Sequence, residues 1–461
     1  MQQTERIISP PGRTCSKIIA FVLAIASFSL TVVLPSHAEE KINIKVDYVA
    51  KLNELAKAGR PEELNAAPYY KKAFELFVKQ PEQLKKINRR IWPDDLTTEQ
   101  REVLQTWVRQ SSKALTQLKK GTQKPHYWPE YRGTSMMGIV LPELWKARAL
   151  AIVFCSRAKL NAAKGNFKQA FSDLLVCYRF GAHFTGPKTL VEQLVGIGIR
   201  TLAADAAFQI LDKQQPASDL LKYFQLQLET LLLQNTFVID FTSEKFFICD
   251  SIRIMFTDDG KGGGPIKQSE VKAIVRQYQQ QGQLSPQEIE ELKRRWGKLE
   301  RQQTTLLADK VYEYYGKVVH KTPWQLRNEG IILEIEKMTN NNALLHVLAP
   351  NVSRVLEVSS RGKADTEALI TTLAFLRYKA DKGLFLRKLD ELLSSGYLKN
   401  LPTDPYSDKS LVYKRTKDNF VLYSLGADFD DDGGIPSKWG EGEKGGDQVF
   451  WPVQPPEKQK K

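Results

Sequence analysis

Apolar positions along most of residues 45 to 395 recur at steps of three and four, the pattern of amphipathic helices. Thr97 and Gln100 have the spacing of a capping box, and they predict a helix that continues to about Lys120. A second apolar series predicts a longer helix that ends at Gly165-Asn166. Its members are Leu144, Ala147, Ala151, Phe154, Ala158 and Ala162.

Further helices are expected from about Phe167 and after Gly186-Pro187, so the chain predicts a stack of helical hairpins. The segment Ala158-x3-Ala162-Ala163-x-Gly165-Asn166-x3-Ala170 resembles the turn of a tetratricopeptide unit. No regular period of about 34 residues accompanies it. We therefore expect general helix-pair packing, only weakly tetratricopeptide-like.

The periodicity changes toward the C-terminus. Residues 411–415 and 420–424 alternate like strands around a turn at 416–419, and 448–451 predicts a third short strand. The predicted fold is mainly α, with a small C-terminal α+β module in which a helix packs on a short antiparallel sheet. The expected divisions are a signal peptide (1–38), a helical domain (39–340), the α+β module (341–451) and a disordered basic tail (452–461).

The N-terminal segment has the pattern of a signal peptide. Arg6, Arg13 and Lys17 precede an apolar stretch over residues 18–34, and small residues lead to Ala38. Cleavage near Ala38 would make the protein periplasmic or secreted, with no membrane span after cleavage. A retained anchor is the alternative, because the stretch is at the lower limit of what crosses a bilayer.

Composition and charge narrow the class of partner. The chain has 461 residues, of which 42% are apolar and 26% charged, the balance of a globular protein with two or three structural units. Its formal charge is +14; the segment before the expected cleavage site contributes +2, which leaves +12. In an exported protein this charge favours solubility or attraction to anionic envelope surfaces. The predicted partner is a protein or a cell-envelope polymer, with no nucleic acid.

Candidate catalytic chemistry is sparse. The histidines after the leader are not at metal-ligand spacing, and no serine or cysteine motif indicates a nucleophile: His126, His183, His320 and His346. The sequence therefore predicts no catalytic or organic-cofactor residue. Three cysteines remain after cleavage, Cys155, Cys177 and Cys249, and an odd number excludes a complete disulfide framework. A bridge between Cys155 and Cys177 across a hairpin and buried free thiols both remain open.

The segment 428–447 is the chain's candidate metal site. It contains seven acidic residues and two lysines within a basic protein. Asp428, Asp430, Asp432 and Gly433 match the first half of an EF-hand loop, but the twelfth position is Trp439. The composition predicts a calcium loop of another kind, with a merely solvated acidic loop as the alternative.

One stretch resembles a known family. Gly396-Tyr-Leu-Lys-Asn-Leu-Pro-Thr-Asp-Pro-Tyr406, Leu411-Val-Tyr413 and Leu422-Tyr-Ser-Leu-Gly-Ala-Asp428, followed by Gly433-Gly434, resemble the globular domain of the major pseudopilin of type II secretion. The likeness covers about residues 360 to 451. It implies a long helix on a small antiparallel sheet, with calcium held by the loop after the second strand. The carried-over ligand candidates are Asp428 and Asp447, then Asp430, Asp432 and the Leu422 or Ser424 region.

The whole chain also resembles a family of bacterial secreted, helix-rich proteins with the same C-terminal tail, a likeness that implies no activity. The leading hypothesis is an exported binding or scaffold protein of the cell envelope with a calcium-stabilised module. The alternatives are an envelope hydrolase with a cleft between helical hairpins and an accessory protein that contacts secretion pseudopilins. The sequence leaves the oligomeric state open.

Overall fold

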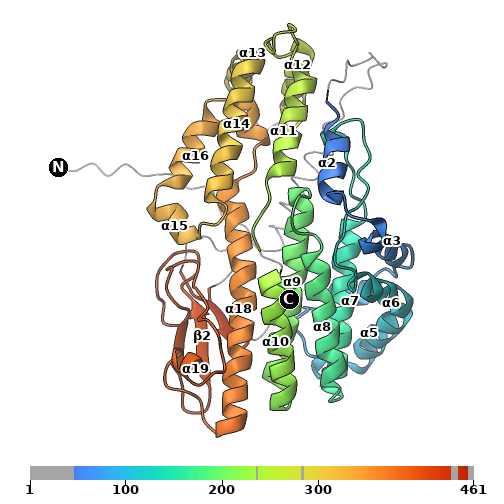
Figure 1. Ribbon diagram of the computed structural model, residues 1–461, viewed down its shortest axis with the longest axis vertical. Coiled ribbons are helices and arrows are strands. Elements are labelled where there is room, and N and C mark those ends of the chain that lie inside the picture. The colour runs from blue at the N-terminus through green and yellow to red at the C-terminus, as the bar shows by residue number, and fades with distance from the viewer. Residues whose placement is uncertain (1–45, 235–236, 282–284, 438–444, 455–461) are drawn as a thin grey trace, which may run out of the picture.

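The protein is mainly helical, with one small antiparallel sheet near its C-terminus, as the sequence predicts (Figure 1). The computed structural model describes residues 46–234, 237–281, 285–437 and 445–454. The predicted signal peptide, and residues 455–461 of the predicted tail, lie outside these ranges.

The helices of the first half are α2 (Tyr48–Lys57), α3 (Ala67–Glu75), α4 (Glu82–Lys85), α5 (Thr98–Gln110), α6 (Ser112–Gly121), α7 (Leu144–Ala163), α8 (Phe167–Ala182), α9 (Leu190–Lys213) and α10 (Ser218–Gln234). The second half contributes α11 (Thr242–Met255), α12 (Gln268–Gln281), α13 (Pro286–Gly297), α14 (Arg301–Val318), α15 (Pro323–Asn328), α16 (Ile331–Asn340), α17 (Ala343–Leu348), α18 (Val352–Lys382) and α19 (Glu391–Ser394). Short 3₁₀ turns cover Glu62–Leu64, Pro93–Asp95 and Met136–Gly138.

The predicted hairpin of α7 and α8 is confirmed, and it forms one core with α9, α10 and α18. Helix α7 buries side chains on several sides, because α5, α8 and α9 all pack against it. The single apolar stripe read from the sequence therefore describes only part of its buried surface.

The capping box at Thr97 is confirmed, since the Thr97 hydroxyl accepts from the Gln100 amide and the Gln100 side chain accepts from the Thr97 amide. The helix does not continue unbroken to Lys120. At Ser111 the backbone ψ of −6° separates α5 from α6.

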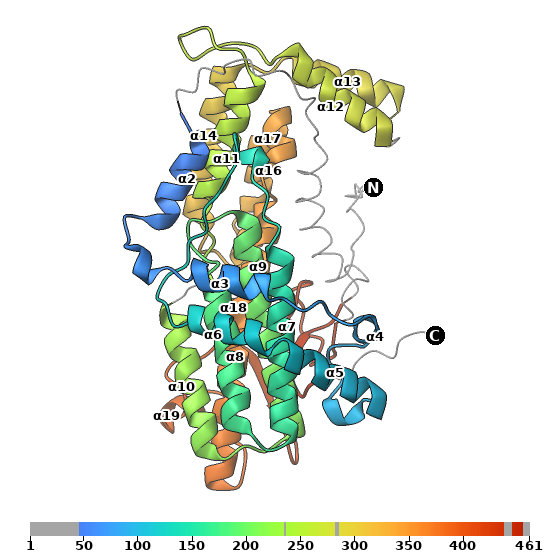
Figure 2. The ribbon, with the colours of Figure 1, turned by 90° about the vertical axis from the view of Figure 1, so that its right-hand side faces the viewer.

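Helices α11 to α17 surround a second core. Figure 2 shows α12 and α13 as a pair that extends away from the rest of the molecule at the end opposite α10. Helix α18 joins both cores: Val352, Val355 and Leu356 belong to the second, whereas Leu369 and Phe375 belong to the first. The C-terminal module thus shares its long helix with the helical body.

The sheet has strand order β1-β2-β3, with β1 at Val412–Arg415, β2 at Phe420–Ser424 and β3 at Gln448–Trp451. Both strand pairs are antiparallel, and Tyr413 lies opposite Leu422. The Phe375 ring of α18 stacks on Tyr413 with centroids 4.3 Å apart and contacts Phe420 at 4.8 Å. The three predicted strands and the helix packed on them are therefore present.

By length and composition, α9 alone among the described helices would suit a membrane span. Its most apolar window is 67% buried, and α7, α8 and α18 pack against it. Burial of this kind is also typical of the central helix of a folded core.

Candidate metal site in the C-terminal acidic loop

Asp447 lies where the acidic loop returns to the sheet, directly before β3. Its backbone pairs with the opposite arm of the loop: the Asp447 amide donates to the Ile435 carbonyl at 2.8 Å, and the Ser437 amide donates to the Asp447 carbonyl at 2.9 Å. This pairing turns the Asp447 side chain inward, where only 1% of the residue is exposed.

The Asp447 carboxylate has one satisfied and one unsatisfied oxygen. Its Oδ2 accepts from the Gly434 amide at 2.6 Å, while its buried Oδ1 has no hydrogen-bond partner among the described residues. Burial raises the pKa of Asp447 to about 6; the backbone amides of Gly434 and Asp432 oppose this rise, and the charges of Asp431 and Asp432 add to it. Such a carboxylate is costly as an uncompensated anion.

Asp428 and Asp432 lie in the first arm of the loop and face glycines of its second arm. The Gly446 amide donates to Asp428 Oδ2 at 2.9 Å. A β-carbon placed on Gly445 would lie 3.4 Å from Asp428 Oδ2 and 3.4 Å from Asp432 Oδ2, so both carboxylates border this glycine. Asp432 Oδ2 is also buried without a hydrogen-bond partner in the described part of the chain.

Asp430 and Asp431 have other contacts. Asp430 is exposed, and its Oδ1 accepts from the Asp431 amide at 3.0 Å. Asp431 Oδ1 accepts from the Tyr423 hydroxyl at 2.7 Å and from the Gly433 amide at 2.9 Å. The hydroxyl and then the amide hold the pKa of Asp431 below its usual value. Its carboxylate therefore holds the loop against β2.

The four predicted ligands are Asp428, Asp430, Asp432 and Asp447. Within the described ranges, no three histidine, cysteine, aspartate or glutamate side chains converge closely enough to hold a metal ion. Asp428, Asp432 and Asp447 border the same end of the loop, but Asp430 faces outward. Glu441 and Glu443, the remaining acids of the loop, lie outside the described residues.

Sequence reasoning gave no role to Asp404, which anchors the module. Its carboxylate is completely buried and accepts from the Ser424 hydroxyl at 2.6 Å, the Ser407 hydroxyl at 2.9 Å and the Tyr406 amide at 3.0 Å. The Leu425 amide donates to it as well, at 3.2 Å. The Ser424 hydroxyl, part of the carried-over ligand region, is thereby directed toward Asp404.

The acidic loop also contacts the helical body. Phe429 adopts a left-handed backbone conformation, with φ +67°, and its ring meets the Tyr406 ring edge-on at 5.5 Å. The Arg327 guanidinium of α15 lies 4.6 Å from the centroid of the Phe429 ring. The Trp324 amide donates to the Pro405 carbonyl at 3.1 Å. A change in the conformation of the loop would therefore alter its contact with α15.

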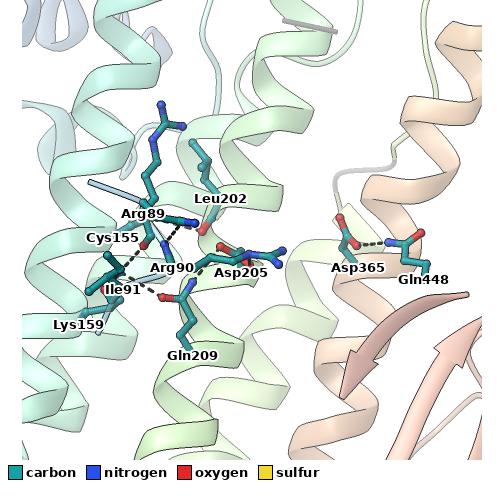
Figure 3. A network of polar contacts seen from close by, with 11 residues as sticks. Arg89, Arg90, Ile91, Cys155, Lys159, Leu202, Asp205, Gln209, Asp365 and Gln448 are labelled. Carbon is teal, nitrogen blue, oxygen red and sulfur yellow. Dashed lines mark hydrogen bonds and ion pairs between the residues drawn. The ribbon is translucent and has the colours of Figure 1, made fainter. Parts of the chain in front are cut away.

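A polar network lies beside the loop, where β3 meets the bundle (Figure 3). Gln448 Nε2 donates to Asp365 Oδ1 of α18 at 2.9 Å. Burial raises the pKa of Asp365 to about 6; Arg361 and Arg90 oppose this rise, and Asp205 adds to it. Arg90 pairs with Asp205 of α9 at 3.0 Å.

The buried Lys159 completes this network from α7. Its Nζ donates to the Arg89 carbonyl at 2.6 Å, to the Ile91 carbonyl at 3.2 Å and to Gln209 Oε1 at 3.2 Å (Figure 3). Burial lowers its pKa. These three acceptors fix the segment before α5 against α7 and α9.

A second buried cluster surrounds the start of α9. Tyr131 donates its hydroxyl to Glu192 Oε2 at 2.8 Å, and the Thr189 hydroxyl donates to the same oxygen at 2.7 Å. Burial raises the pKa of Glu192 and lowers that of Lys188 to about 8. His183, one of the predicted non-catalytic histidines, pairs its Nδ1 with the Tyr70 hydroxyl at 2.6 Å. The Tyr131 contact joins α9 to the segment before α7, and the Tyr70 contact joins the end of α8 to α3.

Comparison of the chain with family models, with curated proteins and with solved structures found no match.

Proposed function

We propose that the protein is an exported binding or scaffold protein of the cell envelope, whose C-terminal module is stabilised by calcium. The observation that carries the ion site is the buried Asp447 carboxylate, whose Oδ1 lacks a partner in the described structure. Asp432 Oδ2 has the same property. Two such oxygens at one end of an acidic loop are the donors that a hard cation needs.

Asp428, Asp432 and Asp447 would hold the ion after moving closer together than they lie in the structure. Calcium takes six to eight oxygens, so backbone carbonyls, water or further acids of the loop would complete its shell. The bound ion would neutralise carboxylates that otherwise repel, and it would bind only the folded loop, which stabilises the module by mass action. This proposal excludes Asp430 from the ligand set, because that side chain is exposed and hydrogen-bonded within its own turn.

The arrangement of elements supports the likeness to the pseudopilin domain. A long helix packs on an antiparallel sheet, and the acidic loop connects the second strand to the third. These are the features that the resemblance implies. Contact with secretion pseudopilins is a second proposal that rests on this likeness, and co-purification with filament components is its test.

The hydrolase alternative requires convergent carboxylates with perturbed pKa values in a well-formed cleft. An open surface hollow of about 610 Å³ lies on α13, lined by Pro286, Gln287, Glu290, Glu291 and Arg294. Arg294 lowers the pKa of Glu291 there, as in an ordinary surface ion pair. A hollow of about 10 Å³ beside Tyr178 admits a single water at most. Neither hollow favours hydrolysis over binding.

A thermal melt of residues 39–461, stripped with a chelator and then titrated with calcium or magnesium, tests the ion site. We expect calcium to raise the melting temperature of the native protein and to have no effect on Asp447→Asn. Asp418→Asn is the matched control, because Asp418 is an exposed aspartate in the β1–β2 turn of the same module. An equal calcium shift in native protein and Asp447→Asn, or no shift in either, would refute the proposal.

Export is tested separately with the complete chain expressed in a bacterium. Cleavage after Ala38 would give a mature N-terminus at Glu39 in the periplasmic or extracellular fraction, measured by intact mass. Recovery of the uncut chain from the cytoplasm would contradict this part of the proposal and would leave the ion measurement unaffected.

A further inference from the structure

Cys155 lies on α7 and Cys177 lies on α8, the two helices of one hairpin. Both residues are buried, with exposed fractions of 8% and 0%. The register of the two helices is fixed nearer the connecting loop, where Arg157 Nε donates to Asp173 Oδ2 at 2.8 Å and Arg157 Nη2 donates to Asp173 Oδ1 at 2.7 Å. This bidentate pair fixes the axial register of α7 against α8, which brings Cys155 and Cys177 to about the same level of the hairpin.

The hydrogen bonds of the two thiols show where their sulfur atoms lie. The Cys177 thiol points to the Ala151 carbonyl at 3.8 Å, and in a helix this carbonyl is the acceptor for the Cys155 amide. The sulfur of Cys177 therefore lies against the turn of α7 that Cys155 closes. The Cys155 thiol points to the Leu202 carbonyl of α9 at 3.6 Å. Burial raises the pKa of the Cys177 thiol, and the neighbouring Cys155 thiol adds to this rise. Both are unbonded thiols in the structure.

We propose that Cys155 and Cys177 form an intramolecular disulfide when the chain folds under oxidising conditions. One thiol, as thiolate, attacks a disulfide of the oxidant and forms a mixed disulfide. The other then displaces the oxidant, so that the Cys155–Cys177 bond forms. The donor's S–S bond breaks, it accepts two electrons as a pair of thiols, and the protons pass through solvent. Because both thiols are buried in the folded protein, this exchange takes place while the hairpin is assembling.

Cys249 is a different kind of thiol. It lies on α11, is only partly buried and contacts the Tyr48 hydroxyl. Neither of the other cysteines lies in that helix or in the core that it joins. We expect Cys249 to remain a thiol in the monomer, which makes it an internal reference for the pair.

Tryptic peptides separate the three cysteines: residues 149–157 contain Cys155, 169–179 contain Cys177 and 246–253 contain Cys249. The chain is refolded in a mixture of oxidised and reduced glutathione, denatured, alkylated without reduction and digested. We expect the first two peptides to be covalently linked and Cys249 to be alkylated. Alkylation of both Cys155 and Cys177, or linkage of either to Cys249, would overturn the inference.

Two variants separate pairing from general folding effects. Cys249→Ala should retain the linked peptide, and reduction should lower its melting temperature as in the native chain. Cys155→Ala should leave Cys177 free to be alkylated and should make the melting temperature insensitive to reductant. If reduction lowers the melting temperature of Cys155→Ala as much as that of the native chain, the stabilising disulfide is not this one.

The inference uses the proposed export only as the source of an oxidising compartment. Refolding in glutathione tests the pairing without export, and the calcium titration does not involve either thiol. Each proposal can therefore fail without the other.

Discussion

Gly181 of α8 and Gly196 of α9 make a reciprocal backbone contact. A β-carbon on Gly181 would lie 2.5 Å from the Gly196 carbonyl oxygen, and a β-carbon on Gly196 would collide with the Gly181 carbonyl oxygen. Each glycine thus faces the backbone of the other helix, which no rotamer change can move aside. The two central helices approach this closely only because neither residue has a side chain.

Replacing Gly196 by alanine should therefore separate α8 from α9. We expect the free energy of unfolding to fall by about 1–3 kcal/mol, the range of overpacked core positions. Urea unfolding followed by circular dichroism measures this change.

Gly198 is the matched control on the same helix, because a β-carbon there meets nothing within 4 Å. Gly198→Ala should be neutral or should stabilise the protein by up to about 1 kcal/mol through helix propensity. Equal losses in the two variants would mean that the close approach of α8 and α9 is not what requires Gly196.

Asp404→Ala should destabilise the C-terminal module with or without calcium. The substitution leaves the Ser424 hydroxyl and the Tyr406 amide without their buried acceptor. Loss of several such bonds costs about 2–4 kcal/mol, whereas Ser424→Ala removes only one of the bonds to Asp404 and should cost about 1 kcal/mol. Unfolding in urea, in chelator and in calcium, compares the two. A loss that disappears in chelator would show that Asp404 acts through the ion instead.

The two aspartates Asp430 and Asp447 should differ in their effect on calcium binding, although the sequence offers both as ligands. Asp447→Asn should abolish the calcium-dependent stabilisation, which would be about 2.7 kcal/mol at a concentration of 100 times Kd. Asp430→Asn should retain most of it, because Asp430 is exposed. Calorimetric titration of both variants measures the difference. The reverse order would place the ion on the outer side of the loop.

Asp365 should make the free energy of unfolding fall as the pH rises. Its pKa of about 6 in the folded protein exceeds the value of about 4 in an unfolded chain. Its stabilising contribution is therefore complete below about pH 4 and is lost as the pH rises through about 6. From about pH 4 to about pH 7, Asp365→Asn should gain about 1–3 kcal/mol of stability relative to native protein.

Paired urea titrations across this range, in chelator, measure that gain. The groups around Asp365 are Asp205, Arg90, Arg361, Thr201 and Gln448, and each stays unchanged in the variant. Asp418→Asn, an exposed replacement, should differ from native protein by a constant amount. A constant difference for Asp365→Asn would contradict the raised pKa.

Local signals predicted much of the fold. Three predicted features depend only on neighbouring residues, and the structure contains all of them. They are the capping box at Thr97, the end of α7 just before Gly165 and the strand at 448–451. The break at Ser111 was missed because the apolar spacing continues through it. The burial of α7 on several sides was also missed, because it depends on which helices assemble around it.

In the candidate site, too, the sequence predicts local features but not contacts that form only on folding. Acidic composition located the loop, and the resemblance singled out Asp447, but no pattern distinguishes the exposed Asp430 from the half-buried Asp432, whose Oδ2 is buried. Asp404 and Ser424 lie 20 positions apart and meet only after the sheet has formed. Periodicity does not encode a contact of this kind.

Helix α18 has a consequence for how the protein comes apart. Its first turns are packed in one core and its later turns in the other, where the sheet also rests on it. Neither core can unfold without disrupting α18, and α18 is also part of the other core. Heat should therefore unfold both cores in a single cooperative transition. An excised fragment beginning at residue 341 would expose Val352, Val355 and Leu356 to water, and isolated, it should be aggregation-prone.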